Sequence, residues 1–508
     1  MGESSNKRLA KNTLILYIRM FITMMISLYT SRIVLNALGV DDYGLYNVIA
    51  GVVAMSSVIT AGMASATQRF LSYELGLKNR EGISKIFSSC VEVHILLAFL
   101  LFVFGEVIGL WFLYNKLQIP DGRIDVAFWL LQFSLLSICI NLIIIPYSAF
   151  IISFEKMNIY AYISIFDAIC KLIIAFLISL VSCDKLLLYG LLLSQITVLN
   201  LIIYYIYCKL KHPETHFSLI WDKAIIKRIF SFSSWTILGQ GGMVIAIQGT
   251  NIIMNIFHTV AANASLGIAN QVNSAVKGLT ANFFTAFQPQ ITKSYAIGDY
   301  SHVIKLTNSA SKMSFFLIYM VSLPIILNIG FLLKIWLGIV PQYADLFCII
   351  IVVSSMFDVI GNPFWVCVYA SGKIKKMQVL SFCVFILELL LFWVACYIGL
   401  SPYKALLVKI IGAILLLCIR VKEGVAVLPD YKIKCFFSDI VFPILITTFV
   451  SAILGLGVKM IMTDNLLLDV ISIFLIAILS AIVAYFLGLT KHERSYMRMI
   501  IKEKIRRK

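Results

Sequence analysis

The sequence is dominated by apolar windows of about twenty residues, the length that crosses a bilayer as a helix, and these follow one another along nearly the whole chain. Hydrophobic residues make up 61% of the 508 positions and charged residues 13%, which leaves too little polar surface for a soluble protein of this size. We therefore predict an all-α polytopic membrane protein with about 14 transmembrane helices. The windows are 13–37, 45–71, 86–113, 125–150, 159–181, 186–208, 229–256, 262–289, 306–333, 344–370, 377–399, 403–421, 438–462 and 466–489.

The net charge of +17 is distributed unevenly across these windows. About 29 of the 42 Lys and Arg residues fall in loops on the side of the N-terminus, and about six fall on the opposite side. This asymmetry predicts that both termini are cytoplasmic. It also accounts for the basic balance through topology and contact with membrane lipids, so nucleic acid is not an expected partner.

Cofactor chemistry is not expected from the motifs of this chain. The eleven cysteines lack CxxC spacing, which argues against a metal site, and no GxxxxGK[ST] motif for ATP occurs. A membrane polysaccharide polymerase would bring a sizeable outside loop with clustered acids and bases, whereas the longest outside loop here is the short segment 114–125. We therefore expect neither a cofactor nor an enzymatic activity.

Two segments of the chain resemble each other. "ATQRFLSYELG", residues 66–76, and "FQPQITKSYAIG", residues 287–298, share Gln, Ser, Tyr and Gly at one constant interval. The interval covers six windows, an even number, so the two halves are predicted to be parallel repeats with a substrate site between them. The predicted domains are an N-lobe at 1–210, an interfacial linker with a short helix at 211–228, a C-lobe at 229–422, a helix pair at 435–489 and a basic tail at 490–508.

Polar side chains form rows on one face of the first two windows of each half. Asn and Gln in such rows must face protein or water, because in lipid their hydrogen-bonding groups would be unsatisfied. Single Ser or Thr residues more often bond their own helix backbone or pack against a neighbouring helix. The amides that we consider as cavity-lining candidates are Gln240, Asn251, Asn270 and Asn273.

Ionisable residues within the windows narrow the choice further, because each costs about 2.5–3.5 kcal/mol at mid-membrane. Arg19, Lys277 and Lys312 are candidate cavity cations, whereas Arg32 and Arg69 lie near window ends and could reach a lipid headgroup. The acids are candidates for ion coupling or for internal ion pairs. An internal ion pair is expected above all between Asp167 and Lys171. The acidic candidates are Glu92, Asp167, Asp358 and Glu388. A cationic, polar-walled cavity would select an anion such as a phosphate.

The segment "SRIVLNALGVDDYGLYNVIAGVVAMSSVITAGMASATQRFLSYELG", residues 31–76, resembles the Wzx-type polysaccharide flippases of the multidrug/oligosaccharidyl-lipid/polysaccharide exporter superfamily. LNALG followed by YGLYN, and the ending R-F-x-x-Y-x-x-G, carry the resemblance. It implies two six-helix lobes, an extra C-terminal helix pair and a cationic central cavity. It also implies that Arg69 attracts a diphosphate headgroup into the cytoplasmic mouth of that cavity.

The resemblance implies that the chain moves undecaprenyl-diphosphate-linked oligosaccharide from the inner to the outer leaflet of the bacterial inner membrane, for surface polysaccharides such as lipopolysaccharide O-antigen. A monomer is expected, with polysaccharide polymerase and glycosyltransferases as possible partners of the pathway. A cation-coupled multidrug exporter or a lipid II flippase of the same fold is the alternative. A carrier of cations would be expected to bring acids in the first window, where this chain has Arg19 and Arg32.

Overall fold

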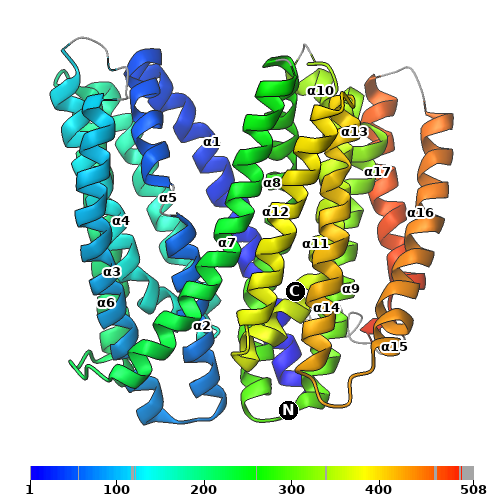
Figure 1. Cartoon of the computed structure of the whole chain (residues 1–508), viewed down its shortest axis with the longest axis horizontal. Helices are drawn as coiled ribbons and strands as arrows, with labels where there is room; N and C mark the ends of the chain where they lie inside the picture. Colours follow the sequence, from blue (N-terminus) through cyan, green and yellow to red (C-terminus); the bar gives the residue numbers. More distant parts are fainter. Residues whose placement is uncertain are drawn as a thin grey trace, which may run out of the picture. The chain divides into compact units, whose positions relative to one another are not determined.

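The computed structural model describes residues 2–54, 57–115, 119, 122–258, 260–337, 340–462, 466–490 and 493–494. All regular elements within these ranges are helical, so the predicted all-α fold class is confirmed (Figure 1). Eleven helices in the described part of the chain are long and apolar enough to cross a membrane. The protein is therefore a multi-pass membrane protein.

The chain folds as two compact units, which we call the N-lobe and the C-lobe. The N-lobe is Arg8–Ile237, and the C-lobe comprises Met1–Lys7 and Leu238–Lys508. The N-lobe contains most of α1 (Gly2–Ala54), α2 (Ser57–Gly76), α3 (Arg80–Asn115), α4 (Ile124–Ser153), α5 (Met157–Leu180), α6 (Lys185–Lys211), the 3-10 turn η1 (Pro213–Thr215) and the start of α7 (Lys223–Phe257). The C-lobe contains the rest of α7, α8 (Val260–Ala296), α9 (Tyr300–Leu327), α10 (Ile329–Leu337), α11 (Ala344–Ser371), α12 (Lys375–Tyr397), α13 (Pro402–Leu406), α14 (Val408–Ala426), α15 (Ile433–Phe436), η2 (Phe437–Val441), α16 (Phe442–Ile461), α17 (Leu466–Val483) and η3 (Ala484–Gly488).

Three expected spans are helical but are not among the eleven apolar ones. The window 45–71 is shared by α1 and α2, and its residues 55 and 56 lie outside the described part of the chain. The window 262–289 lies within α8, where Asn and Gln side chains lower the hydropathy. The window 403–421 is divided between α13 and α14, and α14 carries Lys409 and Arg420. In α8 and α14, polar side chains pack against other helices, which removes the need for a fully apolar surface.

The glycine of the LNALG motif separates the first two spans. Gly39 interrupts α1 with φ 79° and ψ 176°, a conformation that L-residues with a side chain rarely adopt. The two segments of α1 consequently run in different directions (Figure 1). The guanidinium of Arg123, just before α4, bonds both carboxylate oxygens of Asp42 and also pairs with Asp184, which caps α6. Arg123 thus ties the bend in α1 to the starts of α4 and α6.

The two repeated motifs end α2 and α8 with the same local geometry. Lys78 and Gly298 have positive φ angles and donate their N–H groups to carbonyls of the preceding turn at 3.2 and 3.1 Å. The next residues, Asn79 and Asp299, cap α3 and α9 by accepting a backbone N–H at 3.0 and 3.1 Å. The structure therefore pairs Lys78 with Gly298, whereas the sequence motif pairs Gly76 with Gly298. The local repeat is present, shifted by two residues.

The segment predicted as an interfacial linker, 211–228, lies within the N-lobe and differs from its expected form. Residues 216–222 are not helical, and α7 starts at Lys223, within the segment expected to form a separate interfacial helix. The backbone N–H groups of Ile220 and Trp221 instead donate to Oε1 of Glu92 on α3 at 2.8 and 3.2 Å. Because a carboxylate from another helix satisfies these donors, the segment does not need helical hydrogen bonds.

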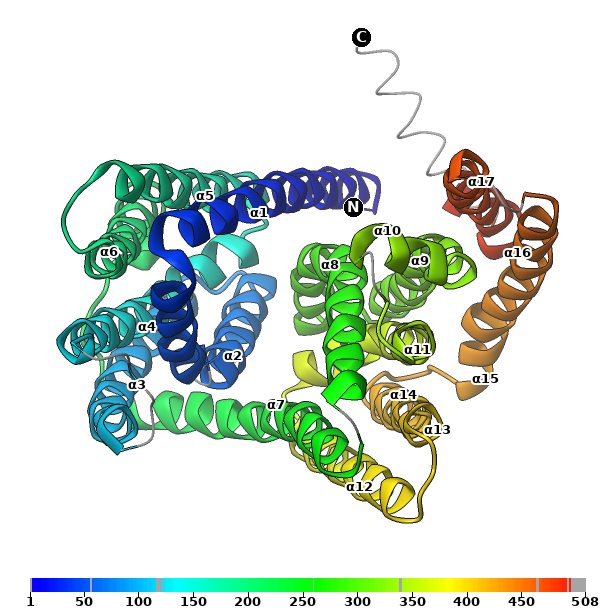
Figure 2. The ribbon, with the colours of Figure 1, turned by 90° about the horizontal axis from the view of Figure 1, so that it is seen from above.

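The C-terminal helix pair packs on the edge of the C-lobe. The helices α16 and α17 lie side by side, and both contact α9 (Figure 2). The hydroxyl of Tyr319 on α9 donates to the carbonyl of Thr448 at 2.9 Å, and Ser472 on α17 donates to Oδ1 of Asn328 at 3.2 Å. Such interhelical hydrogen bonds join helices where the hydrophobic effect cannot.

Candidate functional site: a polar cavity and a charge network

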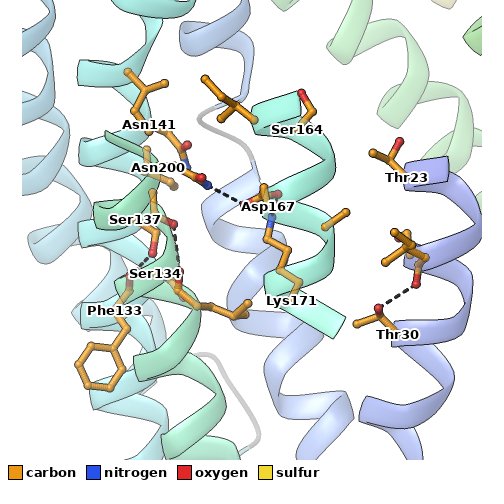
Figure 3. Close-up of a pocket in the computed structure, with 18 of the residues that line it drawn as sticks. Thr23, Thr30, Phe133, Ser134, Ser137, Asn141, Ser164, Asp167, Lys171 and Asn200 are labelled. Carbon is orange, nitrogen blue, oxygen red and sulfur yellow. Dashed lines mark hydrogen bonds and ion pairs between the residues drawn. The ribbon is translucent and has the colours of Figure 1, made fainter. Parts of the chain in front are cut away.

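A polar cavity of about 1030 Å³ lies within the N-lobe. Its walls come from α1, α2, α4, α5 and α6, and Figure 3 shows part of them. Ser and Thr hydroxyls, four tyrosines and two asparagines line the cavity together with three charged side chains, Arg19, Asp167 and Lys171. The lining therefore carries a formal charge of +1 and many neutral hydrogen-bonding groups.

The polar face predicted on the first span lines this cavity. Arg19, Thr23, Ser27 and Thr30 all belong to its wall. The guanidinium of Arg19 donates to the hydroxyl of Ser164 at 3.5 Å. It also lies over the ring of Tyr160, 4.9 Å from the centroid, where the ring face attracts a cation. The α5 side chains thus orient Arg19 within the cavity wall.

Asp167 forms the centre of a hydrogen-bonded group in the same cavity. Its Oδ2 lies 2.8 Å from Nζ of Lys171, one helical turn further along α5, as the spacing predicted. Its Oδ1 accepts a hydrogen bond from the amide of Asn200 on α6 at 2.7 Å. Asn141 on α4 lines the same cavity (Figure 3). Asp167 is therefore neutralised locally by Lys171, and the three charged side chains of the wall sum to a formal charge of +1.

The C-lobe contains a network of charged side chains from four helices. Lys277 of α8 lies 2.9 Å from Asp358 of α11, and Arg420 of α14 lies 3.5 Å from the same carboxylate. Lys409 of α14 lies 2.5 Å from Glu388 of α12. Three cations and two acids give this network a formal charge of +1. Isolated charges at this depth would be costly, so pairing explains how α8, α11, α12 and α14 can hold them.

Close helix packing gives this network its shape. Asn273 and Lys277 are one turn apart on α8 and meet Ser355 and Asp358 on α11, at 2.6 and 2.9 Å. Gly412 of α14 lies directly against the carboxylate of Glu388, so a side chain at this position would collide with it. The predicted polar face of α8 therefore serves, in part, to pack against α11.

The other amide candidates occupy different positions. The side chain of Asn251 donates to that of Gln248 on the same helix at 3.3 Å, and the backbone carbonyl of Asn270 accepts from Ser274 at 2.8 Å. Gln240 is half-buried on α7. Their predicted role in substrate binding remains a prediction.

Arg69 does not extend from a helix end toward lipid headgroups, because it is buried with 4% exposure. Its guanidinium lies 4.7 Å from the ring centre of Phe70, 5.0 Å from that of Tyr73 and 5.5 Å from that of Phe232. These aromatic contacts attach α2 to the start of α7 within the N-lobe. The charge of Arg69 can be read from the sequence, whereas the rings that surround it are seen only in the structure.

Lys312 and Arg32 also belong neither to the N-lobe cavity nor to the C-lobe charge network. Lys312 is buried on α9 and pairs with Glu493 at 2.9 Å, while Ser309 donates to the same carboxylate at 3.0 Å. Burial alone would raise the pKa of Glu493, but Lys312 and hydrogen bonds from Thr490 outweigh it and lower this pKa. These contacts indicate that Lys312 attaches the C-terminal segment to α9 and favour this role of Lys312 over substrate binding. Arg32 is exposed on α1.

The acidic candidates also divide into groups. Glu92 is buried and holds the linker through Ile220 and Trp221, which favours a structural role. Asp358 and Glu388 belong to the C-lobe network, and Asp167 to the N-lobe cavity. Within the described residues, no group of His, Cys, Asp and Glu has the arrangement of a metal site.

Sequence reasoning did not identify Arg420, Asn141 or Asn200. Arg420 lies near the end of its window, where a basic residue usually marks the cytoplasmic side, and this position concealed its contact with Asp358. Asn141 and Asn200 lie within apolar windows, in α4 and α6. Isolated amides at such positions are the signal that could have found them, because each needs a partner within the protein.

Comparison with known proteins identifies the fold. The MatE family model matches residues 16–177, which lie in the N-lobe. A MATE crystal structure in the bent conformation is 14% identical over 83% of this chain and 95% of that chain, with a TM-score of 0.69. An outward-facing multidrug resistance MATE family transporter of the MOP superfamily is 16% identical over 84% and 97%, with a TM-score of 0.67.

A further similar structure is a MOP superfamily transporter from Pyrococcus furiosus, described as having a binding pocket of reverse polarity. It is 14% identical over 84% of this chain and 97% of that chain, with a TM-score of 0.65. Comparison with curated protein sequences gave no significant match. The chain has the fold of the MATE transporters, and the MatE family model matches part of its N-lobe. The fold agrees with the predicted superfamily, while membership of that superfamily and of its Wzx-type subfamily stays a prediction.

Proposed function

We propose that this protein moves undecaprenyl-diphosphate-linked oligosaccharide from the inner to the outer leaflet of the bacterial inner membrane, by alternating access. The observation that carries the proposal is the composition of the N-lobe cavity. Arg19 supplies a cation, and the one carboxylate, Asp167, is already held by Lys171 and Asn200. A site of this kind suits an anionic substrate better than a cationic one.

The neutral part of the wall suits a sugar. Hydroxyls and amides both donate and accept hydrogen bonds, as a polyhydroxylated ligand requires. The four tyrosines add flat apolar surface next to a polar group, which suits the faces of sugar rings. The diphosphate would interact with the cations of the protein, of which Arg19 and Lys277 are the proposed holders.

The predicted orientation and pathway follow from the same proposal. We propose that both termini lie in the cytoplasm and that the inward-open protein receives substrate from cytoplasmic glycosyltransferases. A polysaccharide polymerase then consumes it on the outer side. An anionic diphosphate moves outward down the membrane potential, which contributes about 2.3 kcal/mol per charge per 100 mV. Asp167, Asp358 and Glu388 remain the candidates for ion coupling.

Multidrug export is the second candidate, because one of the similar structures is a multidrug resistance transporter of the same fold. Lipid II flipping is the third. Purified protein in proteoliposomes separates them when it is given a fluorescent undecaprenyl-diphosphate oligosaccharide, fluorescent lipid II or a lipophilic cationic dye. We expect transport of the oligosaccharide. Transport of the dye alone would contradict the proposal, and equal transport of lipid II would widen the substrate class.

The Arg19→Gln variant connects that assay with the cavity. Oligosaccharide transport should fall about tenfold or more, since a hydrogen bond to a charged group contributes about 1.5–3 kcal/mol. Arg80→Gln is the matched control, because Arg80 has an 88% exposed side chain. Equal loss in both variants would show that the effect does not come from the cavity.

A further inference from the structure

The C-lobe network has one feature that simple ion pairing does not explain. A single carboxylate, that of Asp358, has two cationic partners from two other helices. Lys277 binds its Oδ2 at 2.9 Å, and Arg420 lies 3.5 Å from its Oδ1. Lys409 has its own acid, Glu388, at 2.5 Å. One cation would be enough to neutralise Asp358, so Arg420 is an additional partner.

The two cations differ in exposure and in attachment. The side chain of Lys277 is 40% exposed, whereas that of Arg420 is 15% exposed. The same Nη1 of Arg420 donates to the backbone carbonyl of Asp358 at 3.2 Å and to the side chain of Asn362 at 3.0 Å. Gly361 leaves room for it, since a Cβ at that position would lie 3.1 Å from Cδ of Arg420. Arg420 is thus fixed beside α11, and Lys277 is the accessible cation.

The guanidinium of Arg420 is not fully used in this structure. Its Nε is buried and has no hydrogen-bond partner among the described residues. A guanidinium can bind a carboxylate through two parallel N–H groups, whereas the shortest contact between the Arg420 guanidinium and the Asp358 carboxylate is long, 3.5 Å from Nη1 to Oδ1. The arginine can therefore strengthen its hold on Asp358 if Lys277 moves away.

We infer that Asp358 is a displaceable counter-ion of Lys277, and that Arg420 is the positioning residue that retains Asp358 when an anionic substrate takes Lys277. This inference rests on the proposed function and names the residues that make Lys277 available. Without Arg420, release of Lys277 would leave a carboxylate without a cation inside the lobe, which is strongly unfavourable. With Arg420, the carboxylate of Asp358 remains paired throughout. To bind Lys277, the diphosphate then has to replace only the Lys277–Asp358 contact and not the Arg420–Asp358 contact.

The inference is tested by binding of undecaprenyl diphosphate to the full-length protein in detergent micelles, measured calorimetrically. Arg420→Gln should weaken binding about tenfold, equivalent to about 1.4 kcal/mol, because Asp358 then depends on Lys277 alone. Asp358→Asn should tighten binding by a similar factor, because Lys277 loses its competitor. Lys376→Gln, which removes the 66% exposed cation of an ion pair with Glu423 in the same lobe, should leave binding unchanged.

The double variant distinguishes retention of Asp358 from direct binding of substrate. If Arg420 acts only through Asp358, then Arg420→Gln should have no effect when Asp358→Asn is already present. Weaker binding on adding Arg420→Gln to that background would mean that Arg420 contacts the diphosphate itself, and would overturn the inference. Unchanged binding in the single Arg420→Gln variant would overturn it as well.

Two further measurements keep these outcomes interpretable. Each variant is compared by size-exclusion chromatography, and Arg420→Lys, which keeps the charge, should retain most of the binding if Arg420→Gln proves unstable. Loss of binding in a well-folded Arg420→Lys variant equal to that in Lys277→Gln would contradict a role limited to Asp358. If the wild type binds the probe but the double variant behaves otherwise than expected, only the inference fails. Absence of wild-type binding overturns both the inference and the proposed function.

Discussion

The two lobes hold their intramembrane charges in different ways. In the N-lobe, Arg19, Asp167 and Lys171 lie on the wall of a cavity among hydroxyls and amides. In the C-lobe, Lys277, Arg420 and their partners connect four packed helices. The ends of α2 and α8 nevertheless share their local geometry. The two lobes thus share a turn and a helix cap at these positions, while one holds its charges in a cavity wall and the other in an ion network.

This contrast predicts where charge removal disturbs folding most. Glu388 is buried with 7% exposure and forms one pair with Lys409. Glu388→Gln should lower stability by about 3–5 kcal/mol, since it leaves an uncompensated cation inside the lobe. The measurement is thermal unfolding in detergent. Replacing both partners by apolar residues, Glu388→Leu with Lys409→Met, should restore most of the loss, and a double variant as unstable as the single one would refute the ion-pair explanation.

The attachment of the C-terminal segment should have the next largest effect. Glu493→Gln should cost about 1.5–3 kcal/mol, because Lys312 loses a charged hydrogen-bond partner. The lowered pKa of Glu493 adds a pH dependence. Its contribution is fully present above the ordinary glutamate pKa and is lost as the pH falls through the lowered pKa of the folded protein. Unfolding measured from neutral to acidic pH should therefore show a smaller acid-induced loss in Glu493→Gln than in wild type, and identical profiles would exclude this contribution.

The bend at Gly39 should show a smaller effect, confined to the N-lobe. Gly39→Ala places a non-glycine residue at φ 79° and ψ 176°, a backbone region essentially limited to glycine, which costs about 1–3 kcal/mol. No heavy atom lies within 4 Å of the added Cβ, so the cost comes from the backbone alone. Gly267 on α8 is the control, since it also has open space at its Cβ and no positive φ. Equal thermal shifts for Gly39→Ala and Gly267→Ala would show that the backbone conformation is not the cause.

The smallest effect is expected within the cavity. Lys171→Gln removes a pair whose side chains are 46% and 26% exposed, so stability should change by about 1 kcal/mol or less. Thermal unfolding of this variant beside Glu388→Gln compares the lobes directly. A loss as large as that of Glu388→Gln would mean that the N-lobe charges support the fold as much as the C-lobe network does.

The sequence predicted the fold class because the hydrophobic windows depend on composition and length alone. It also predicted a break between the windows 13–37 and 45–71, where Gly39 bends α1, and the Asp167–Lys171 pair, both from local patterns. It did not predict the partners of Lys277, Lys312 or Arg69, because these come from helices far along the chain. The non-helical linker was missed for the same reason, since its hydrogen bonds end on Glu92.

Arg420 shows why the site was harder to predict than the fold. A basic residue near a helix end is usually explained by topology, and only the packing of α11 against α14 reveals that it faces Asp358. Asn200 is similar, because its partner Asp167 lies on a different helix. Local patterns thus located charged residues, whereas tertiary contacts determined which of them act together.

The central claim is that each lobe contributes a cation that holds the substrate, Arg19 from the N-lobe cavity and Lys277 from the C-lobe network. The most direct test is the initial rate of oligosaccharide flipping in proteoliposomes with Arg19→Gln or Lys277→Gln, using Arg80→Gln and Lys376→Gln as controls. We predict that Arg19→Gln and Lys277→Gln each insert at normal abundance and flip about tenfold or more slowly, while both controls flip at the wild-type rate. Wild-type flipping by both Arg19→Gln and Lys277→Gln at normal protein level would contradict the claim.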